Sequence, residues 1–244
     1  GFKVAKPSFS HTTMHVIPAI DLIGGKCVRL SQGDYQRKTE YHDDPLEMTK
    51  RFEGAGLTRL HLVDLDGAKT GRIENSTAIK GILDKVKVPC ELGGGIRDEK
   101  TVSEALSWGI DRVIIGTKAI HDPQWLYNMA IAFPGKSALG IDAKDGKIAV
   151  AGWLEVSQIT VEQFLDKVND WPLAAIIYTD ISKDGMLQGP SFELYETILN
   201  TVSPVNLIAS GGISTFDELP KLAAMGCEGT IIGKAIYENR IVLK

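Results

Sequence analysis

Eight short apolar runs, separated by segments of helical periodicity, are the feature that most restricts the fold of this sequence. Each run is too short for a stable helix and is bounded by Gly, Asp or Pro, which favours buried parallel strands. The runs are 15–20, 60–63, 88–92, 112–115, 138–141, 175–178, 206–209 and 230–232. The helical segments are 45–55, 76–85, 99–108, 123–133, 161–168, 192–202 and 215–224.

Eight strand–helix units in 244 residues predict one closed (β/α)8 barrel of the α/β class, a TIM barrel. The alternative, an open doubly wound sheet, carries the fingerprint G-x-G-x-x-G after its first strand. Here Asp21-Leu-Ile-Gly-Gly25 follows the first run and does not match. We expect the barrel over 14–244 with a shortened last helix, and a tag-derived or disordered leader over 1–13.

An internal repeat indicates that the barrel consists of two homologous half-barrels. A glycine series with spacings of 15 and 7 residues stands at 94, 109 and 116, and again at 211, 226 and 233. The Ile-Asp pair ending at Asp21 recurs at Asp142, and a Gly-Lys step follows each pair. The two offsets, 117 residues (94 to 211) and 121 residues (21 to 142), are nearly equal. Two half-barrels of four β/α units each explain them together.

Charge and cysteine content exclude several classes of partner. The net charge of −4 gives no overall field for holding nucleic acid or an anionic membrane, and no apolar run approaches the ~20 residues of a membrane span. Cys27, Cys90 and Cys227 lie far apart and form no CxxC, so neither a disulfide framework nor a zinc site is indicated. We therefore expect a reduced cytoplasmic protein, a monomer, with a small-molecule substrate and no metal or cofactor.

Polar side chains that follow strands are the candidates for chemistry, because the active sites of such barrels lie at the carboxyl ends of the strands. Asp21 follows the first run and Asp142 the fifth, so the repeat places them on opposite sides of one barrel mouth. A single Asp in this place can be a helix N-cap, but recurrence at equivalent positions favours catalysis. Thr179 and Asp184 follow the sixth run, where Lys-Asp-Gly is also an ordinary turn.

Glycine clusters at strand ends are the candidates for phosphate binding. Glycine lets backbone N–H groups approach an anion closely, and a helix N-terminus adds about half a positive charge. Tight turns explain one cluster but poorly explain two symmetric ones, so we expect a long substrate with two phosphates. The candidates are Gly94, Gly95, Arg97, Gly116 and Thr117 in the first half, and Gly189, Gly211, Gly212, Gly233 and Lys234 in the second.

Other polar and aromatic positions allow two interpretations each. Arg29, after the first strand, either binds the ligand or faces solvent, and Trp153, after the fifth, either stacks on a heterocycle or packs its own loop. Asp64 and Asp66 after the second strand are weaker candidates for the site. His61 lies at the start of a strand, where a structural role is the more economical interpretation.

Ten motifs together carry a resemblance to a known family. Those of the first half are Pro18-Ala-Ile-Asp-Leu22, Gly25-Lys-Cys-Val-Arg-Leu30, Gln32-Gly-Asp34, Leu62-Val-Asp-Leu-Asp-Gly-Ala68 and Gly93-Gly-Gly-Ile-Arg97. Those of the second half are Gly140-Ile-Asp-Ala-Lys144, Gly152-Trp153, Tyr178-Thr-Asp-Ile-Ser-Lys-Asp-Gly185, Ser210-Gly-Gly-Ile213 and Ile232-Gly-Lys-Ala235. Through them the sequence resembles the ProFAR (phosphoribosylformimino-5-aminoimidazole carboxamide ribotide) isomerases of histidine biosynthesis over roughly 14–244.

This resemblance implies an Amadori rearrangement without a cofactor, in which an aminoaldose becomes an aminoketose. By resemblance, Asp21 is the base that takes the C2 proton, and Asp184 is the first choice for the acid that protonates the ring oxygen. Asp142 is the alternative acid or orients the substrate, and Thr179 hydrogen-bonds the sugar. One carboxyl group must then stay protonated near neutral pH while another stays ionised.

The same resemblance implies that Arg29 and Trp153 contact the substrate when the first and fifth loops close. The nearest rival is the paralogous cyclase, imidazole glycerol phosphate synthase, which shares the repeat and the carboxylates; Gly152-Trp153 and Gln32-Gly-Asp34 favour the isomerase. A dual-substrate isomerase that also accepts phosphoribosyl anthranilate stays open. A regulatory barrel without catalysis fits the intact carboxylates less well.

Overall fold

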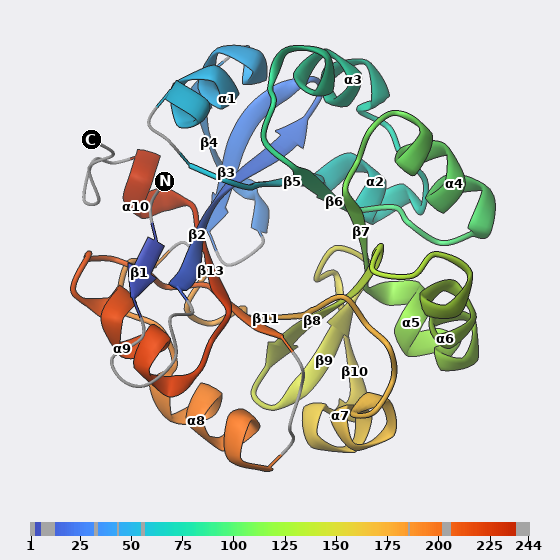
Figure 1. Cartoon of the computed structure of the whole chain (residues 1–244), viewed down its shortest axis with the longest axis vertical. Helices are drawn as coiled ribbons and strands as arrows, with labels where there is room; N and C mark the ends of the chain where they lie inside the picture. Colours follow the sequence, from blue (N-terminus) through green and yellow to red (C-terminus); the bar gives the residue numbers. More distant parts are fainter. Residues whose placement is uncertain are drawn as a thin grey trace.

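The computed structural model describes residues 3–5, 13–31, 34–42, 44–54, 57–184, 186–201 and 206–237. Within them, eight parallel strands form a closed barrel with helices around its outside (Figure 1). In order around the barrel they are β2 (Thr13–Ile23), β5 (Leu60–Asp64), β6 (Cys90–Gly93), β7 (Arg112–Ile115), β8 (Ser137–Lys144), β11 (Ile176–Asp180), β12 (Leu207–Ser210) and β13 (Gly229–Ile232). The last strand pairs in parallel with the first, Ile231 opposite Ile17, which confirms the predicted (β/α)8 barrel.

The long helices follow the predicted segments within a few residues. They are α1 (Pro45–Gly54), α3 (Ser76–Lys85), α4 (Glu99–Ser107), α6 (Pro123–Ala132), α7 (Val161–Val168), α8 (Phe192–Thr201) and α9 (Glu218–Met225). Two of them have well-capped first turns: Asp122 accepts from Trp125 N–H before the N1 residue Pro123, and Thr160 forms a capping box with Gln163. Three short helices were not predicted: α2 (Leu65–Thr70), α5 (Thr117–His121) and α10 (Lys234–Tyr237).

The segments after the first and fifth barrel strands, predicted as long loops, contain β-hairpins. The added strands are β3 (Lys26–Ser31), β4 (Asp34–His42), β9 (Lys147–Val150) and β10 (Glu155–Thr160). Two-residue turns join each barrel strand to its partner, with positive φ at Gly24 (56°) and Gly25 (76°) and at Asp145 (52°) and Gly146 (75°). Positive φ at both turn residues is typical of type I′ hairpins, so the two half-barrels repeat the same local structure.

Part of the stretch expected to be a leader forms a strand. Lys3–Ala5 is β1, which pairs antiparallel with the beginning of β2, Ala5 opposite Thr13. Residues 1, 2 and 6–12 lie outside the described residues, as does everything after Tyr237, including most of the end where a shortened helix was predicted. Among the described helices, none has the length and apolar character that a membrane span needs.

Side chains inside the barrel alternate with those that pack against the helices, as the pleat of each strand requires. The apolar interior layer is Ile17, Ala19, Ile114, Ala138, Ala175, Ile177, Ile208 and Ile231. A larger core between strands and helices surrounds it. On β5, β6 and β7 the interior instead holds three buried polar side chains, His61, Glu91 and Arg112. Asp21 lies on the same face of β2 as Ala19, and Asp142 lies on the same face of β8 as Gly140. Both aspartates are therefore at the barrel mouth.

Candidate active site

A cavity of about 180 Å³ opens at the carboxyl ends of the barrel strands. It brings together most of the predicted site, from both half-barrels. The predicted residues that line it are Asp21, Asp142, Thr179, Asp184, Gly94, Gly95, Arg97, Gly116, Thr117 and Trp153. Asp21 and Asp142 therefore share one barrel mouth, as the repeat predicts.

Asp21 is held by a strand on each side. It lies on β2, where its backbone is opposite Val63 of β5 and Val28 of β3. The residue is 8% exposed and lines the cavity. The backbone is therefore fixed by two ladders while the carboxylate stays accessible to a ligand.

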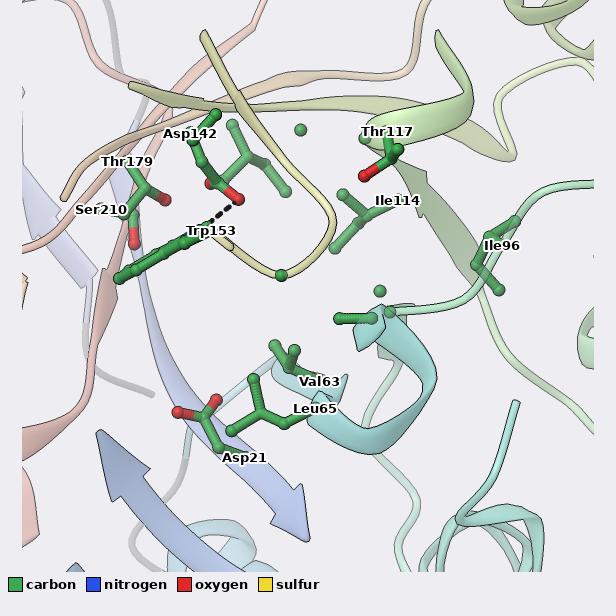
Figure 2. A pocket seen from close by; sticks show the side chains of 18 of the residues that line it. Asp21, Val63, Leu65, Ile96, Ile114, Thr117, Asp142, Trp153, Thr179 and Ser210 are labelled. Carbon is green, nitrogen blue, oxygen red and sulfur yellow. Dashed lines mark hydrogen bonds between the residues drawn. The ribbon is translucent and has the colours of Figure 1, made fainter. Parts of the chain in front are cut away.

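Asp142 occupies the equivalent place on β8, but its surroundings differ. Its Oδ2 accepts a hydrogen bond of 2.6 Å from Nε1 of Trp153, drawn as the dashed line in Figure 2. Burial raises the pKa of Asp142, whereas the hydrogen bonds from Trp153 and Thr179 and the charge of His61 lower it. Because burial is the largest influence, the pKa lies above its ordinary value, and Asp142 holds a proton more readily than an exposed carboxyl group.

The segment that carries Trp153 has a strained backbone. Ala151, Gly152 and Trp153 have positive φ values of 53°, 64° and 70°. A non-glycine residue in this region costs about 1–3 kcal/mol, so neighbouring contacts must hold it. The Trp153–Asp142 hydrogen bond is one, and the second is a 2.9 Å bond from Ala151 N–H to Oγ1 of Thr117. Thr117, predicted to bind phosphate, thus also supports this turn.

His61 is a cavity residue for which the sequence favoured a structural role. Its Nδ1 lies 3.0 Å from Oε1 of Glu91, and Nε of Arg112 donates to Oε2 of Glu91 at 2.6 Å. Glu91 is completely buried. Burial raises its pKa, but the hydrogen bonds and charge interactions with His61 and Arg112 outweigh burial and lower the pKa to about 2. The carboxylate thereby orients an imidazole at the cavity floor. The alternation of side chains along β5 could have predicted this place, because it puts His61 on the same face of the strand as Val63.

Thr179 and Asp184 come from β11 and the turn after it. Thr179 lies opposite both Asp142 of β8 and Ser210 of β12. The turn is organised by Asp180, whose carboxylate accepts from the backbone and hydroxyl of Ser182, and whose backbone oxygen accepts from Asp184 N–H at 3.1 Å. This local structure turns Asp184 back towards the cavity.

The first glycine cluster combines packing and access. Gly94 and Gly95 line the cavity with φ of 95° and 84°, and a Cβ on Gly94 would lie 2.2 Å from the backbone oxygen of Asp64. No larger residue fits there, whether or not a phosphate binds. Arg97 donates from Nη2 to the backbone oxygen of Ala68 at 3.0 Å, which places a cation beside these amides.

The second glycine cluster repeats this geometry outside the lining of the cavity. Gly211 and Gly212 have φ of 99° and 83°, and a Cβ on Gly212 would lie 2.4 Å from the backbone oxygen of Gly189. Gly189, Gly211, Gly212 and Gly233 are absent from the lining, although Ser210 and Ile231 beside them belong to it. The side chains of Arg29 and Lys234 lie outside the described part of the structure.

The chemistry available in the cavity is that of carboxyl groups, a hydroxyl group, an imidazole and backbone amides. In the part of the chain that is described, no three His, Cys, Asp or Glu side chains are grouped so that they could hold a metal ion. Three carboxyl groups in one cavity, of which Asp142 has a raised pKa, suit the transfer of protons between neighbouring atoms of a substrate.

Comparison with known proteins agrees with this chemistry. An imidazole-4-carboxamide isomerase of Flavobacterium johnsoniae is 51% identical over 233 residues, 95% of this chain and 97% of that relative. Isomerases of the same name from Flavobacterium psychrophilum and Synechocystis are 49% and 44% identical, over 95% and 94% of this chain and 96% and 91% of the relatives. The family model described as "Histidine biosynthesis protein" matches residues 15–242. The chain therefore belongs to the histidine biosynthesis protein family.

Proposed function

We propose that this protein is the aldose–ketose isomerase of histidine biosynthesis that converts ProFAR to PRFAR. The observation that carries the proposal is the meeting of Asp21, Asp142 and Asp184 in one cavity. The names of the similar relatives, which are isomerases and not cyclases, support this function over that of the paralogous cyclase.

The reaction needs one proton to be donated and another to be removed. An acid protonates the ring oxygen as the C1–O bond breaks, and the nitrogen on C1 supplies the electron pair for a C1=N bond. A base then removes the proton from C2, the electrons of the C–H bond form a C1=C2 double bond, and the electrons of the C1=N double bond return to the nitrogen. Return of a proton to C1 and loss of the C2 hydroxyl proton give the ketone at C2 and an amine on a CH2 group.

In our assignment Asp21 is the base and Asp184 is the acid. Asp142, with its hydrogen bonds from Trp153 and Thr179, orients the sugar between them. The raised pKa of Asp142 supports the alternative in which Asp142 gives the proton, because an acid must be protonated near neutral pH. Phosphates held at the two glycine clusters would supply binding energy remote from the reacting carbon.

Trp153 must change position during the cycle under this proposal. The cavity, with the indole drawn between Asp142 and Asp21 in Figure 2, measures about 180 Å³. Pockets for drug-sized ligands hold roughly 300–1,000 Å³. A substrate with two phosphates therefore fits only after the indole leaves its place between Asp142 and Asp21, for example to stack on the imidazole of the substrate. The turn at Ala151 and Trp153 is suited to such a change, because leaving the positive φ region would relieve its backbone strain.

Steady-state turnover of ProFAR by the wild type and the three variants Asp21→Asn, Asp142→Asn and Asp184→Asn tests the proposal. Asp21→Asn should lower kcat by at least about a hundredfold, the low end for general acid–base catalysis, and keep substrate binding. The acid is the residue whose amide variant loses the basic limb of the pH–rate profile. Full activity of Asp21→Asn would refute its role, and ammonia-dependent cyclisation without isomerase turnover would favour the paralogous function.

A further inference from the structure

The side chain of Asn75 connects two segments of the barrel mouth. Its Oδ1 accepts a 2.8 Å hydrogen bond from Gly25 N–H, in the turn between β2 and β3. Its Nδ2 donates to Oδ1 of Asp64 at 2.7 Å and to Oδ2 of Asp66 at 3.0 Å. Asp66 in turn accepts from Gly24 N–H at 2.8 Å. We call these four hydrogen bonds the Asn75 bridge; they join the Gly24–Gly25 turn to the segment after β5.

The bridge uses polar groups that have no hydrogen-bond partner within the hairpin or within the first turn of α3. In a two-residue hairpin the N–H groups of the two turn residues point away from the ladder and would otherwise bond water. Asn75 is the N-cap residue of α3, and such residues usually bond the helix's own first turn, but its side chain makes no capping hydrogen bond. The carboxamide is 93% buried (7% exposed), with its donor and acceptor directed to the bridge.

Asp64 makes one end of the bridge rigid. It is completely buried and accepts from the backbone N–H of Gly67, Glu74 and Asn75 at 2.7–2.8 Å, besides the Asn75 carboxamide. Its backbone also lies opposite Leu22, the residue after Asp21. The turn three residues beyond Asp21 is therefore fixed to the same rigid segment as the strand that carries it.

Among the described residues of the second half-barrel, no side chain forms such a bridge. The residue equivalent to Asp64 is Asp180, whose carboxylate accepts a hydrogen bond from the hydroxyl of Ser191. Ser191 directly precedes α8, as Asn75 directly precedes α3. A serine hydroxyl is too short to reach a hairpin turn as well. In the described part of the chain, no side chain accepts a hydrogen bond from the N–H of Asp145 or Gly146. Of the two hairpins that follow barrel strands, the one next to Asp21 is the one whose turn the described side chains hold in this way.

We propose that Asn75, together with Asp66, is a positioning residue for the reaction: by holding the Gly24–Gly25 turn it fixes the direction in which the Asp21 carboxylate enters the cavity. The proposal rests on the proposed function, in which Asp21 is the base. Small displacements of a reacting group can cost a hundredfold in rate. Loss of the bridge should therefore lower kcat more than it changes KM.

The variants Asn75→Ala and Asn75→Ser separate positioning from stability. Serine can donate to Asp64, as Ser191 does to Asp180, but cannot hold Gly25. We expect both variants to lower kcat at least about tenfold with KM within about twofold, and amide exchange at Gly24 and Gly25 to speed up at least about tenfold. Asn75→Ser should keep a Tm close to that of the wild type.

Ser191→Ala is the matched control for exchange. It removes a hydrogen bond to the equivalent carboxylate and should leave exchange at Gly24 and Gly25 unchanged. Wild-type kcat in Asn75→Ser, or a fall in kcat without faster exchange at the turn, would overturn the proposal. If the wild type itself lacked isomerase turnover, the proposed function would fail, while the exchange measurement would still decide whether Asn75 holds the turn.

Discussion

Replacing Glu91 by Gln should test whether the buried ion cluster under the cavity holds the barrel together. Glu91 is completely buried between His61 and Arg112, and its pKa falls from the ordinary 4.5 to about 2. That difference corresponds to about 3 kcal/mol, since one pKa unit equals ~1.4 kcal/mol. Removing one partner of a buried pair costs about 3–5 kcal/mol, which is the same magnitude.

The pH dependence has a definite sign. Because the folded pKa lies below the unfolded one, the stabilisation is present above about pH 4.5 and is lost as the pH falls towards about 2. Glu91→Gln should thus lower the free energy of unfolding by about 3 kcal/mol at pH 7. At 2–4 °C per kcal/mol for a chain of this size, Tm should fall by roughly 6–12 °C. The difference from the wild type should shrink below pH 4.5.

Urea denaturation followed by circular dichroism, together with Tm from pH 3 to 8, measures both quantities. Glu74→Gln is the control, since Glu74 forms an ion pair with Arg72 (2.7 Å) whose arginine side chain is 79% exposed, and exposed pairs contribute little. A Glu91→Gln variant as stable as the wild type at pH 7, or one whose deficit stays constant down to pH 3, would refute the reasoning.

Three further predictions concern the cavity. Asp142→Asn should be at least as stable as the wild type at pH 8, because a raised folded pKa means that stability falls as pH rises, and Tm against pH measures this. Trp153→Phe removes a hydrogen-bond donor that lowers the pKa of Asp142, so this pKa should rise. In the pH–rate profile, the midpoint that belongs to Asp142, identified by its loss in Asp142→Asn, should move to higher pH. Gly94→Ala should unfold the protein or lower Tm far more than Gly109→Ala. Both glycines have positive φ, but of the two only Gly94 would place a Cβ against the backbone, 2.2 Å from the oxygen of Asp64. Equal Tm values of the two variants would contradict this.

The barrel could be predicted from sequence because its signal is repeated eight times. Buried strands leave apolar runs, and caps such as Asp122-Pro123 mark helix starts. The hairpins after β2 and β8 were missed, since β4 and β10 are largely polar and half of the six residues of β3 are polar, so these strands show no clear apolar period. The short helices α2 and α5 were missed because six and five residues give no periodicity to detect.

The internal repeat predicted which carboxylates share the barrel mouth, but it could not predict the contacts between individual side chains. Asp21 and Asp142 were predicted on one rim, and both line the cavity. His61 gained its role from Glu91 and Arg112 on neighbouring strands, and such a contact depends on register across the sheet. The expectation that both glycine clusters bind phosphate stays a prediction.

The repeat also explains how one scaffold can give two equivalent carboxyl groups different surroundings. Asp21 and Asp142 occupy equivalent places, so the ladder alone gives them the same environment, and a difference must come from unlike neighbours at equivalent positions. The strand beside Asp21 presents Val63, whereas the strand beside Asp142 presents Thr179, which hydrogen-bonds it. Burial and hydrogen bonds thus act on the pKa of Asp142, whereas under our proposal the Asn75 bridge positions Asp21. The repeated fold sets where the two carboxyl groups lie, and unlike side chains at equivalent positions set the surroundings of each.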